Sequence, residues 1–107
     1  MTNFNEYKAL KNKIDFNLLL DVAHLKVSAK TLGLNLEEEF INMMNVSKYI
    51  HISDNDANHD SNNEITKSSN LLPLLKDSDT KDKDFTLEIY DGMNAISNSY
   101  NTLSKVI

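Results

Sequence analysis

The sequence predicts an α/β fold in which three short parallel strands alternate with helices, and three observations favour it. First, the apolar runs FNLLLDV, YIHIS and FTLEIY, at 16–22, 49–53 and 85–90, are short and bounded by polar residues. Second, most segments between them have helical spacing of apolar residues. Third, strands that alternate with helices are typical of right-handed crossovers and a parallel sheet.

The first three elements lie in the N-terminal third of the chain. Residues 4–13 predict a short helix, because Phe4, Tyr7 and Leu10 recur at helical spacing. The run at 16–22 is almost continuously apolar, which suits a strand covered on both faces, although periodicity alone does not exclude a helix. Residues 23–35 are interpreted as a loop with at most a helical turn, closing at Gly33.

The middle of the chain predicts a well-capped helix and a second strand. Asn35 is a typical N-cap residue, and the three glutamates at 37–39 lie near the positive end of the helix dipole. This helix is expected over 36–48, with Phe40 among the residues on its apolar face. The strand at 49–53 then ends in a polar cluster.

The last part of the chain predicts two helices around the third strand. A helix over 68–76 is expected to begin from Ser69 and to be disturbed by Pro73. A mixed-charge loop at 76–84 precedes the strand at 85–90. A terminal helix covers 93–107, with Ile96, Tyr100, Leu103 and either Val106 or Ile107 facing inward.

Length and composition indicate one domain, residues 1–107, without nucleic-acid or membrane partners. A net charge of -5 and the lack of a basic run argue against binding to a phosphate backbone. The absence of cysteine excludes disulfides, thiolate metal sites and a cysteine nucleophile. The N-terminus lacks a signal peptide's apolar region, and no apolar stretch is long enough to span a bilayer, so a cytoplasmic location is expected.

Polar residues with metal-binding chemistry follow the three predicted strands. Asp21, with His24 beyond it, ends the first strand; His51 lies in the second, with Asp60 in the loop beyond, and Glu88 lies in the third. Because the carboxyl ends of parallel strands lie on one side of a sheet, these residues are expected to meet there. Carboxylate and imidazole ligands together suit Mn²⁺, Zn²⁺, Co²⁺ or Fe²⁺.

Each of these residues also has a simpler interpretation. Asp21 alone is typical of a turn at the end of a strand, and His24 of a satisfied loop histidine. His51 is harder to explain, because it lies inside an apolar strand. Glu88, between Leu87 and Ile89, should be paired, bound to metal or facing a polar lumen.

The segments LLLDVAHLKVSAKTLG, YIHISDNDANHDSN and FTLEIY together resemble the closing third of the xylose isomerase-like TIM-barrel superfamily. That superfamily includes sugar-phosphate isomerases, ketose 3-epimerases and an apurinic endonuclease type. The resemblance covers roughly residues 14–104. It implies a partial (β/α)8 barrel of about three parallel βα units.

The resemblance also implies a role for each candidate residue. Asp21, His51 and Glu88 match metal ligands, and Asp60 is a further candidate ligand. His24 matches a histidine that contacts substrate in the epimerases, and Glu88 also matches an acid/base. The implied cofactor is a divalent metal, Mn, Zn, Co or Mg. The implied substrate is a small sugar or sugar phosphate, transformed by proton transfer next to its carbonyl.

Four departures from the family pattern limit this interpretation. Asn62 stands where many members have histidine, and ITKSSN at 65–70 replaces a Gly-rich stretch; both argue against the nuclease, the least favoured alternative. A complete barrel needs about 250 residues, and the family's earlier-strand glutamate has no counterpart here. The chain is therefore expected to be a C-terminal fragment, inactive alone, which persists by pairing with a companion fragment, by self-association, or only as a poorly folded product. The alternative is a non-catalytic barrel remnant or subunit.

Overall fold

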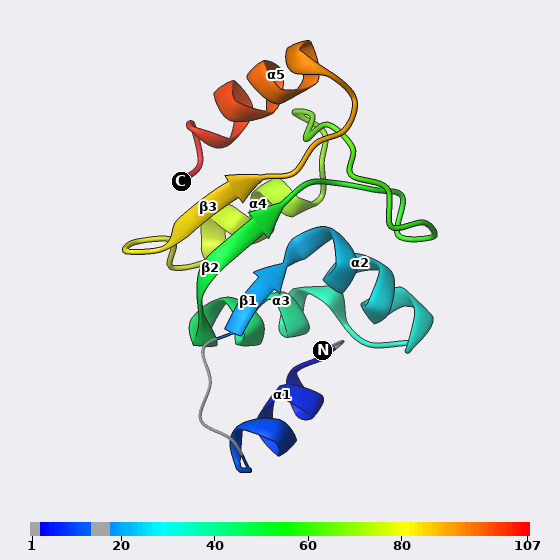
Figure 1. Cartoon of the computed structure of the whole chain (residues 1–107), viewed down its shortest axis with the longest axis vertical. Coiled ribbons are helices and arrows are strands. Elements are labelled where there is room, and N and C mark those ends of the chain that lie inside the picture. The colour runs from blue at the N-terminus through cyan, green and yellow to red at the C-terminus, as the bar shows by residue number, and fades with distance from the viewer. Residues whose placement is uncertain (1–2, 14–17) are drawn as a thin grey trace.

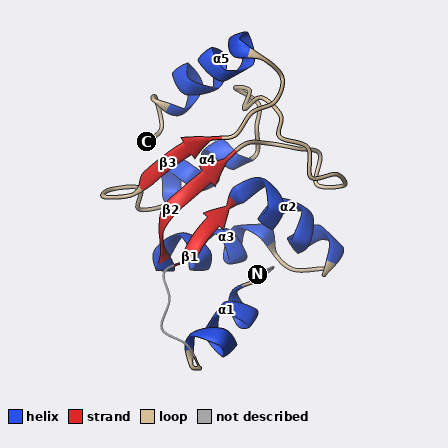
Figure 2. Ribbon diagram, in the orientation of Figure 1, coloured by secondary structure: helices blue, strands red, loops and turns tan. Residues whose placement is uncertain are grey.

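The computed structural model describes residues 3–13 and 18–107, which form five helices and three strands (Figures 1 and 2). The strands lie side by side in the middle of the molecule, with α1 and α5 at its two ends. The elements, in chain order, are α1 (Phe4–Lys11), β1 (Leu18–Asp21), α2 (Val22–Thr31), α3 (Leu36–Val46), β2 (Ser47–Ile52), α4 (Leu71–Asp77), β3 (Asp84–Leu87) and α5 (Met93–Leu103).

The three strands form one parallel sheet in the order β1-β2-β3, which confirms the predicted parallel α/β sheet. Asp21 pairs in register with His51, and His51 pairs with Thr86 on the other side. A register shift between Leu18 and Leu19 interrupts the first pairing. The described elements are compatible with three βα units of a barrel, and they form an open sheet.

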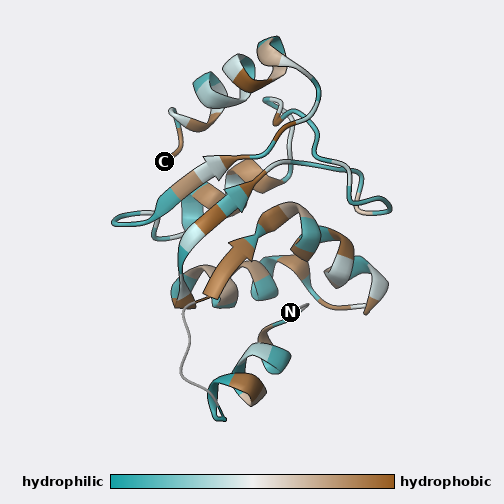
Figure 3. Ribbon diagram, viewed as in Figure 1, coloured by the Kyte–Doolittle hydropathy of each residue, from teal (hydrophilic) through white to brown (hydrophobic). Residues whose placement is uncertain are grey.

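One face of the sheet packs into the hydrophobic core. Alternate residues of a strand point to opposite faces, and the core face carries Leu20, Ile50 and Ile52, each at most 3% exposed. Figure 1 shows α3 and α4 behind the sheet, and Figure 3 shows β1 as largely hydrophobic and β2 and β3 as alternating between hydrophobic and hydrophilic residues. The helices contribute the core residues Val22, Leu25, Phe40, Met43, Met44, Leu71 and Leu75.

The opposite face of the sheet is more open to solvent. Leu19 and Tyr49 are partners in register on this face, and they are 48% and 45% exposed. Asp21, His51 and Glu88 lie on the same face, two residues further along each strand or beyond. The open face therefore carries the Leu19–Tyr49 pair with Asp84 beside it, and Asp21, His51 and Glu88 toward the carboxyl ends of the strands.

The prediction of a loop over 23–35 is wrong, because α2 occupies Val22–Thr31. Val22, Leu25 and Ala29 form its buried stripe at helical spacing. Asp21 caps this helix, since its Oδ1 accepts a hydrogen bond from the His24 backbone N–H at 3.1 Å. The predicted N-cap at Asn35 is confirmed by its contact with the Glu38 N–H.

The strand boundaries differ from the prediction by a few residues. β1 ends at Asp21, since Val22 already begins α2, and residues 16 and 17 of the predicted strand lie outside the described residues. β2 begins two residues early, at Ser47. β3 ends at Leu87, yet the Glu88 N–H still donates to the Ile52 carbonyl at 3.1 Å. Glu88 therefore keeps its place beside β2.

The expected disturbance of a helix by Pro73 and the expected inward position of Tyr100 are also wrong. Helix α4 begins after Asn70, and Pro73 lies in its first turn, where the backbone N–H groups have no partner within the helix and proline is tolerated. Tyr100 of α5 points outward, with 66% exposure, whereas Ala95, Ser99 and Leu103 are buried. Among the described residues, no helix is long and apolar enough to cross a membrane.

Candidate functional site

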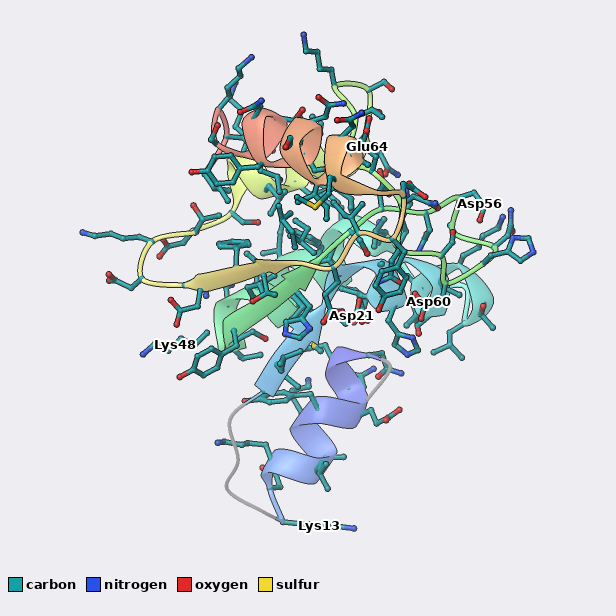
Figure 4. All side chains as sticks on the ribbon, turned by 45° about the horizontal axis from the view of Figure 1, so that its top comes forward. Lys13, Asp21, Lys48, Asp56, Asp60 and Glu64 are labelled. Atoms are coloured by element: carbon teal, nitrogen blue, oxygen red, sulfur yellow. The ribbon has the colours of Figure 1, made fainter. Side chains whose placement is uncertain are left out.

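The candidate site lies on the open face of the sheet, at the carboxyl ends of the strands. The register places Asp21 of β1 beside His51 of β2, and Glu88 follows β3 by one residue. Figure 4 shows Asp21 at the end of β1, and Lys48 at the opposite end of the sheet. The structure thus brings the three predicted ligands to the same end of the sheet, where the parallel strands have their carboxyl ends.

His51 and Glu88 are the closest pair in this group. The Nδ1 atom of His51 lies 2.7 Å from Oε1 of Glu88, and the two side chains are 29% and 33% exposed. Protonation of His51 would make this contact an ion pair. Partial exposure leaves both groups within reach of a ligand, while the sheet fixes their backbones.

Asp21 is the last residue of β1 and also the N-cap of α2. One carboxylate oxygen caps the helix at the His24 N–H. This cap sets the direction in which α2 leaves the sheet and places His24 in its first turn. Local helix geometry alone thus explains the spacing of Asp21 and His24.

The loop that follows β2 brings Asp60 to His24. The Nδ1 atom of His24 lies 3.3 Å from Oδ2 of Asp60, and both side chains are nearly half exposed. Figure 4 shows Asp21 and Asp60 on the same side of the molecule, with Asp56 further out on the loop. Asp60 therefore joins the group through His24.

The outer part of this loop is shaped by its own side chains. Hydrogen bonds from the Asn58 and His59 backbone N–H groups lower the pKa of Asp56 below its ordinary value. His59, 81% exposed, contacts Asp56 and lies in a solvated loop. Ala57 adopts a positive φ of 69° between the two turns.

A buried ionic network that the sequence does not predict lies beneath this loop. The Lys26 Nζ donates to Asp54 Oδ1 and to the Asn55 carbonyl, both at 2.7 Å. Asp54 also accepts hydrogen bonds from the Asn55 N–H and the Ser69 hydroxyl. Each of these four residues is at most 9% exposed. The network joins α2, which carries His24, to the loop that carries Asp60.

A signal for this network was present in the sequence. Lys26 lies between Leu25 and Val27 in an apolar stretch, four residues after Val22 and three before Ala29 on the buried side of α2. A lysine at a core position requires a buried partner. A loop over 23–35, as predicted, has no core position, so the prediction does not mark Lys26 as buried.

The donor atoms suit a divalent metal in their chemistry, and the structure gathers them in part. Two ligands of one tetrahedral ion each lie about 2.1 Å from it, and so about 3.4 Å apart; the His51 Nδ1 and Glu88 Oε1 atoms, at 2.7 Å, instead lie at hydrogen-bond distance from each other. Within residues 3–13 and 18–107, however, no group of three or more His, Asp or Glu side chains is close enough together to hold a metal ion.

A groove of about 270 Å³ opens beside the site. Residues Leu18, Leu19, Leu20 and Asp21 of β1, His24 and Leu25 of α2, and Met43 of α3 line it. A larger hollow of about 570 Å³ involves Glu64 and the outer side of α5, and none of the predicted site residues lines it. The groove along β1 is therefore the cavity that adjoins the candidate site.

Comparison with protein families, with curated proteins and with solved structures finds no match to this chain in any of the three.

Proposed function

We propose that this chain is the C-terminal βα part of a metal-dependent sugar or sugar-phosphate isomerase or epimerase of the xylose isomerase-like type. The observation that carries the proposal is the common placement of Asp21, His51 and Glu88 on one face and at one edge of a parallel sheet. In α/β folds with parallel strands, ligands bind at the carboxyl ends of the strands.

In this proposal, Asp21, His51 and Glu88 would hold the metal. A divalent ion would polarise the sugar carbonyl and its neighbouring hydroxyl. The sheet register holds Asp21 beside His51, and the first turn of α2 presents His24 toward the same edge. His24 would then orient substrate oxygens, supported by Asp60 at 3.3 Å.

Proton transfer would fall to Glu88. A general base must reach the proton and keep a carboxylate free to accept it. Glu88 is one-third exposed, and its Oε1 lies 2.7 Å from the His51 Nδ1. The second acid/base of the family would come from outside these residues, so the chain alone is expected to be inactive.

Metal titration of the full chain tests the proposal. Mn²⁺ binding, followed by electron paramagnetic resonance, should fall at least tenfold in His51→Ala, because an imidazole ligand is lost. His59→Ala is the matched control, since His59 is exposed and contacts Asp56 in the outer loop. Equal binding by both variants, or no binding by the unmodified chain, would contradict a metal site at His51.

A second candidate is a non-catalytic subunit or barrel remnant. It is favoured by the observation that the described residues gather no three-ligand group. Absence of Mn²⁺, Zn²⁺ and Co²⁺ binding in the complex with a partner polypeptide would favour this candidate over the enzyme.

A further inference from the structure

We propose that the hollow between residues 64–68 and α5 binds a phosphate group, either as free hydrogen phosphate or on a small phosphate monoester. This is the hollow of about 570 Å³ described above. Asp21, His51 and Glu88 do not line it, so the proposal is separate from the candidate metal site. Its volume lies within the range of about 300–1,000 Å³ that is usual for small-molecule sites.

Hydrogen bonds hold the two walls of this hollow together. The Ile65 N–H donates to the Ser99 hydroxyl at 2.9 Å, and both residues are fully buried. The Glu64 N–H donates to the Asp91 carboxylate at 2.9 Å, and Asn98 Nδ2 donates to Glu64 Oε1 at 3.4 Å. Figure 4 shows Glu64 beside α5. The hollow is therefore formed before any ligand arrives, as small-molecule sites usually are.

The lining of the hollow is polar. Apart from the buried Ile65, every residue that lines it has a hydroxyl, an amide or a charged group. A lipid or an aromatic ligand needs apolar contact area, and this lining offers very little. The ligand that fits it is small and hydrophilic.

Lys67 and Lys105 give the hollow its positive charge. Lys67 belongs to the 64–68 wall, and Lys105 follows the end of α5. Neither ammonium group has a hydrogen-bond or ion-pair partner within the described part of the chain. Lysine is a common ligand of phosphate, to which it presents a compact positive charge.

The rest of the molecule does not attract an anion to this place. The chain has a net charge of -5, and the C-terminal half of α5 presents the negative end of the helix dipole. Attraction of an anion therefore depends on the two lysines, which makes the proposal easy to test by substitution.

Glu64 determines which anion the hollow prefers. Its carboxylate repels a fully ionised anion such as sulfate, whereas hydrogen phosphate has a proton that it can donate to a carboxylate oxygen. Asn98 contacts Oε1 of Glu64, and Oε2 has no partner among the described residues. The lysines thus attract an anion, and Glu64 selects one that still carries a proton.

Titration of the full chain with inorganic phosphate, followed by NMR of the backbone amides, tests the proposal. The measurement is made in EDTA and at about pH 6, where a phosphate monoester still holds part of its second proton. The amides of residues 64–68 should shift to saturation. Lys67→Gln and Lys105→Gln should each raise the Kd about fivefold, because each removes a charge-assisted contact. Lys76→Gln is the matched control, since Lys76 is exposed on α4 and does not line the hollow.

Glu64→Gln tests the selectivity. The unmodified chain should bind phosphate about tenfold more tightly than sulfate, and the variant should bind the two anions within about twofold of each other, because the repelling charge is gone. Glutamine keeps an oxygen that accepts from Asn98, so the wall is preserved. Thermal unfolding followed by circular dichroism shows that each variant is folded.

Glycerol phosphate distinguishes the two sources of the phosphate group. Tighter binding than that of inorganic phosphate would support a monoester as the ligand, and weaker binding would support free phosphate. Shifts that do not saturate, or equal weakening in all three lysine variants, would overturn the proposal, since both indicate diffuse attraction. Sulfate binding as tight as phosphate binding in the unmodified chain would overturn the selective role of Glu64.

Discussion

Two acid–base pairs with the same distance between nitrogen and oxygen lie in neighbouring parts of this molecule, and they differ in burial. Lys26 Nζ and Asp54 Oδ1 are 2.7 Å apart, with side chains 9% and 13% exposed. His51 Nδ1 and Glu88 Oε1 are also 2.7 Å apart, with side chains 29% and 33% exposed. Distance alone therefore does not distinguish a structural pair from one that can meet a ligand.

The difference lies in the partners of each pair. Around Lys26 and Asp54, hydrogen bonds to Asn55 and Ser69 occupy the polar atoms and tie α2 to the loop after β2. His51 and Glu88 face the open side of the sheet. We infer that the first pair maintains the frame and that the second is available for chemistry.

The largest expected effect is on the buried pair. Lys26→Met should lower the free energy of unfolding by about 3 kcal/mol, because it leaves the Asp54 carboxylate buried without its cation. Urea denaturation followed by circular dichroism measures this. Lys30→Met is the matched control, one turn later on α2, where Lys30 contacts the exposed Asn58; its cost should stay below about 0.5 kcal/mol. Equal losses in the two variants would remove the distinction.

A smaller effect is expected at the open pair. Glu88→Gln should change the free energy of unfolding by less than about 1 kcal/mol, since solvent screens a pair that is one-third exposed. The same urea experiment measures it. A loss as large as that of Lys26→Met would mean that Glu88 belongs to the frame and is poorly suited to proton transfer.

The smallest effect is expected at Asp56, two residues after Asp54 and on the solvent side of the same loop. The Asn58 and His59 N–H groups hold the pKa of Asp56 below its ordinary value. The carboxylate of Asp56 therefore stabilises the fold fully at pH values above the pKa that Asp56 has in the unfolded chain. That contribution should be lost as the pH falls through the folded pKa. Carboxyl carbon shifts in an NMR titration would show the lowered pKa, and an ordinary value would contradict the turn geometry.

Much of the sheet could be predicted from the sequence, because short apolar runs are a local signal for strands. The start of α3 could be predicted in the same way from its cap, Asn35. The order and direction of the strands followed from their alternation with helices. The neighbouring positions of Asp21 and His51 followed in turn from the parallel direction. These features depend on patterns of a few residues, which a sequence displays directly.

The remaining features depend on contacts between distant segments. Helix α2 was missed because Thr, Val and Ser dilute its helical signal, while its cap, Asp21, also suits the end of a strand. The Lys26–Asp54 pair joins residues 28 positions apart. The outward position of Tyr100 depends on which side of α5 meets the core. The His51–Glu88 contact depends on the alignment of two strands that no local pattern specifies.

The double use of Asp21 has a consequence for mutation and for evolution. A change to alanine at this position removes a helix start and a candidate ligand together, so a loss of activity there would not identify its cause. Asparagine keeps the oxygen that begins α2 and discards the negative charge. A lineage that abandoned the chemistry while keeping the architecture would therefore drift first to asparagine, serine or threonine at this position, and such a substitution would record the history of the site.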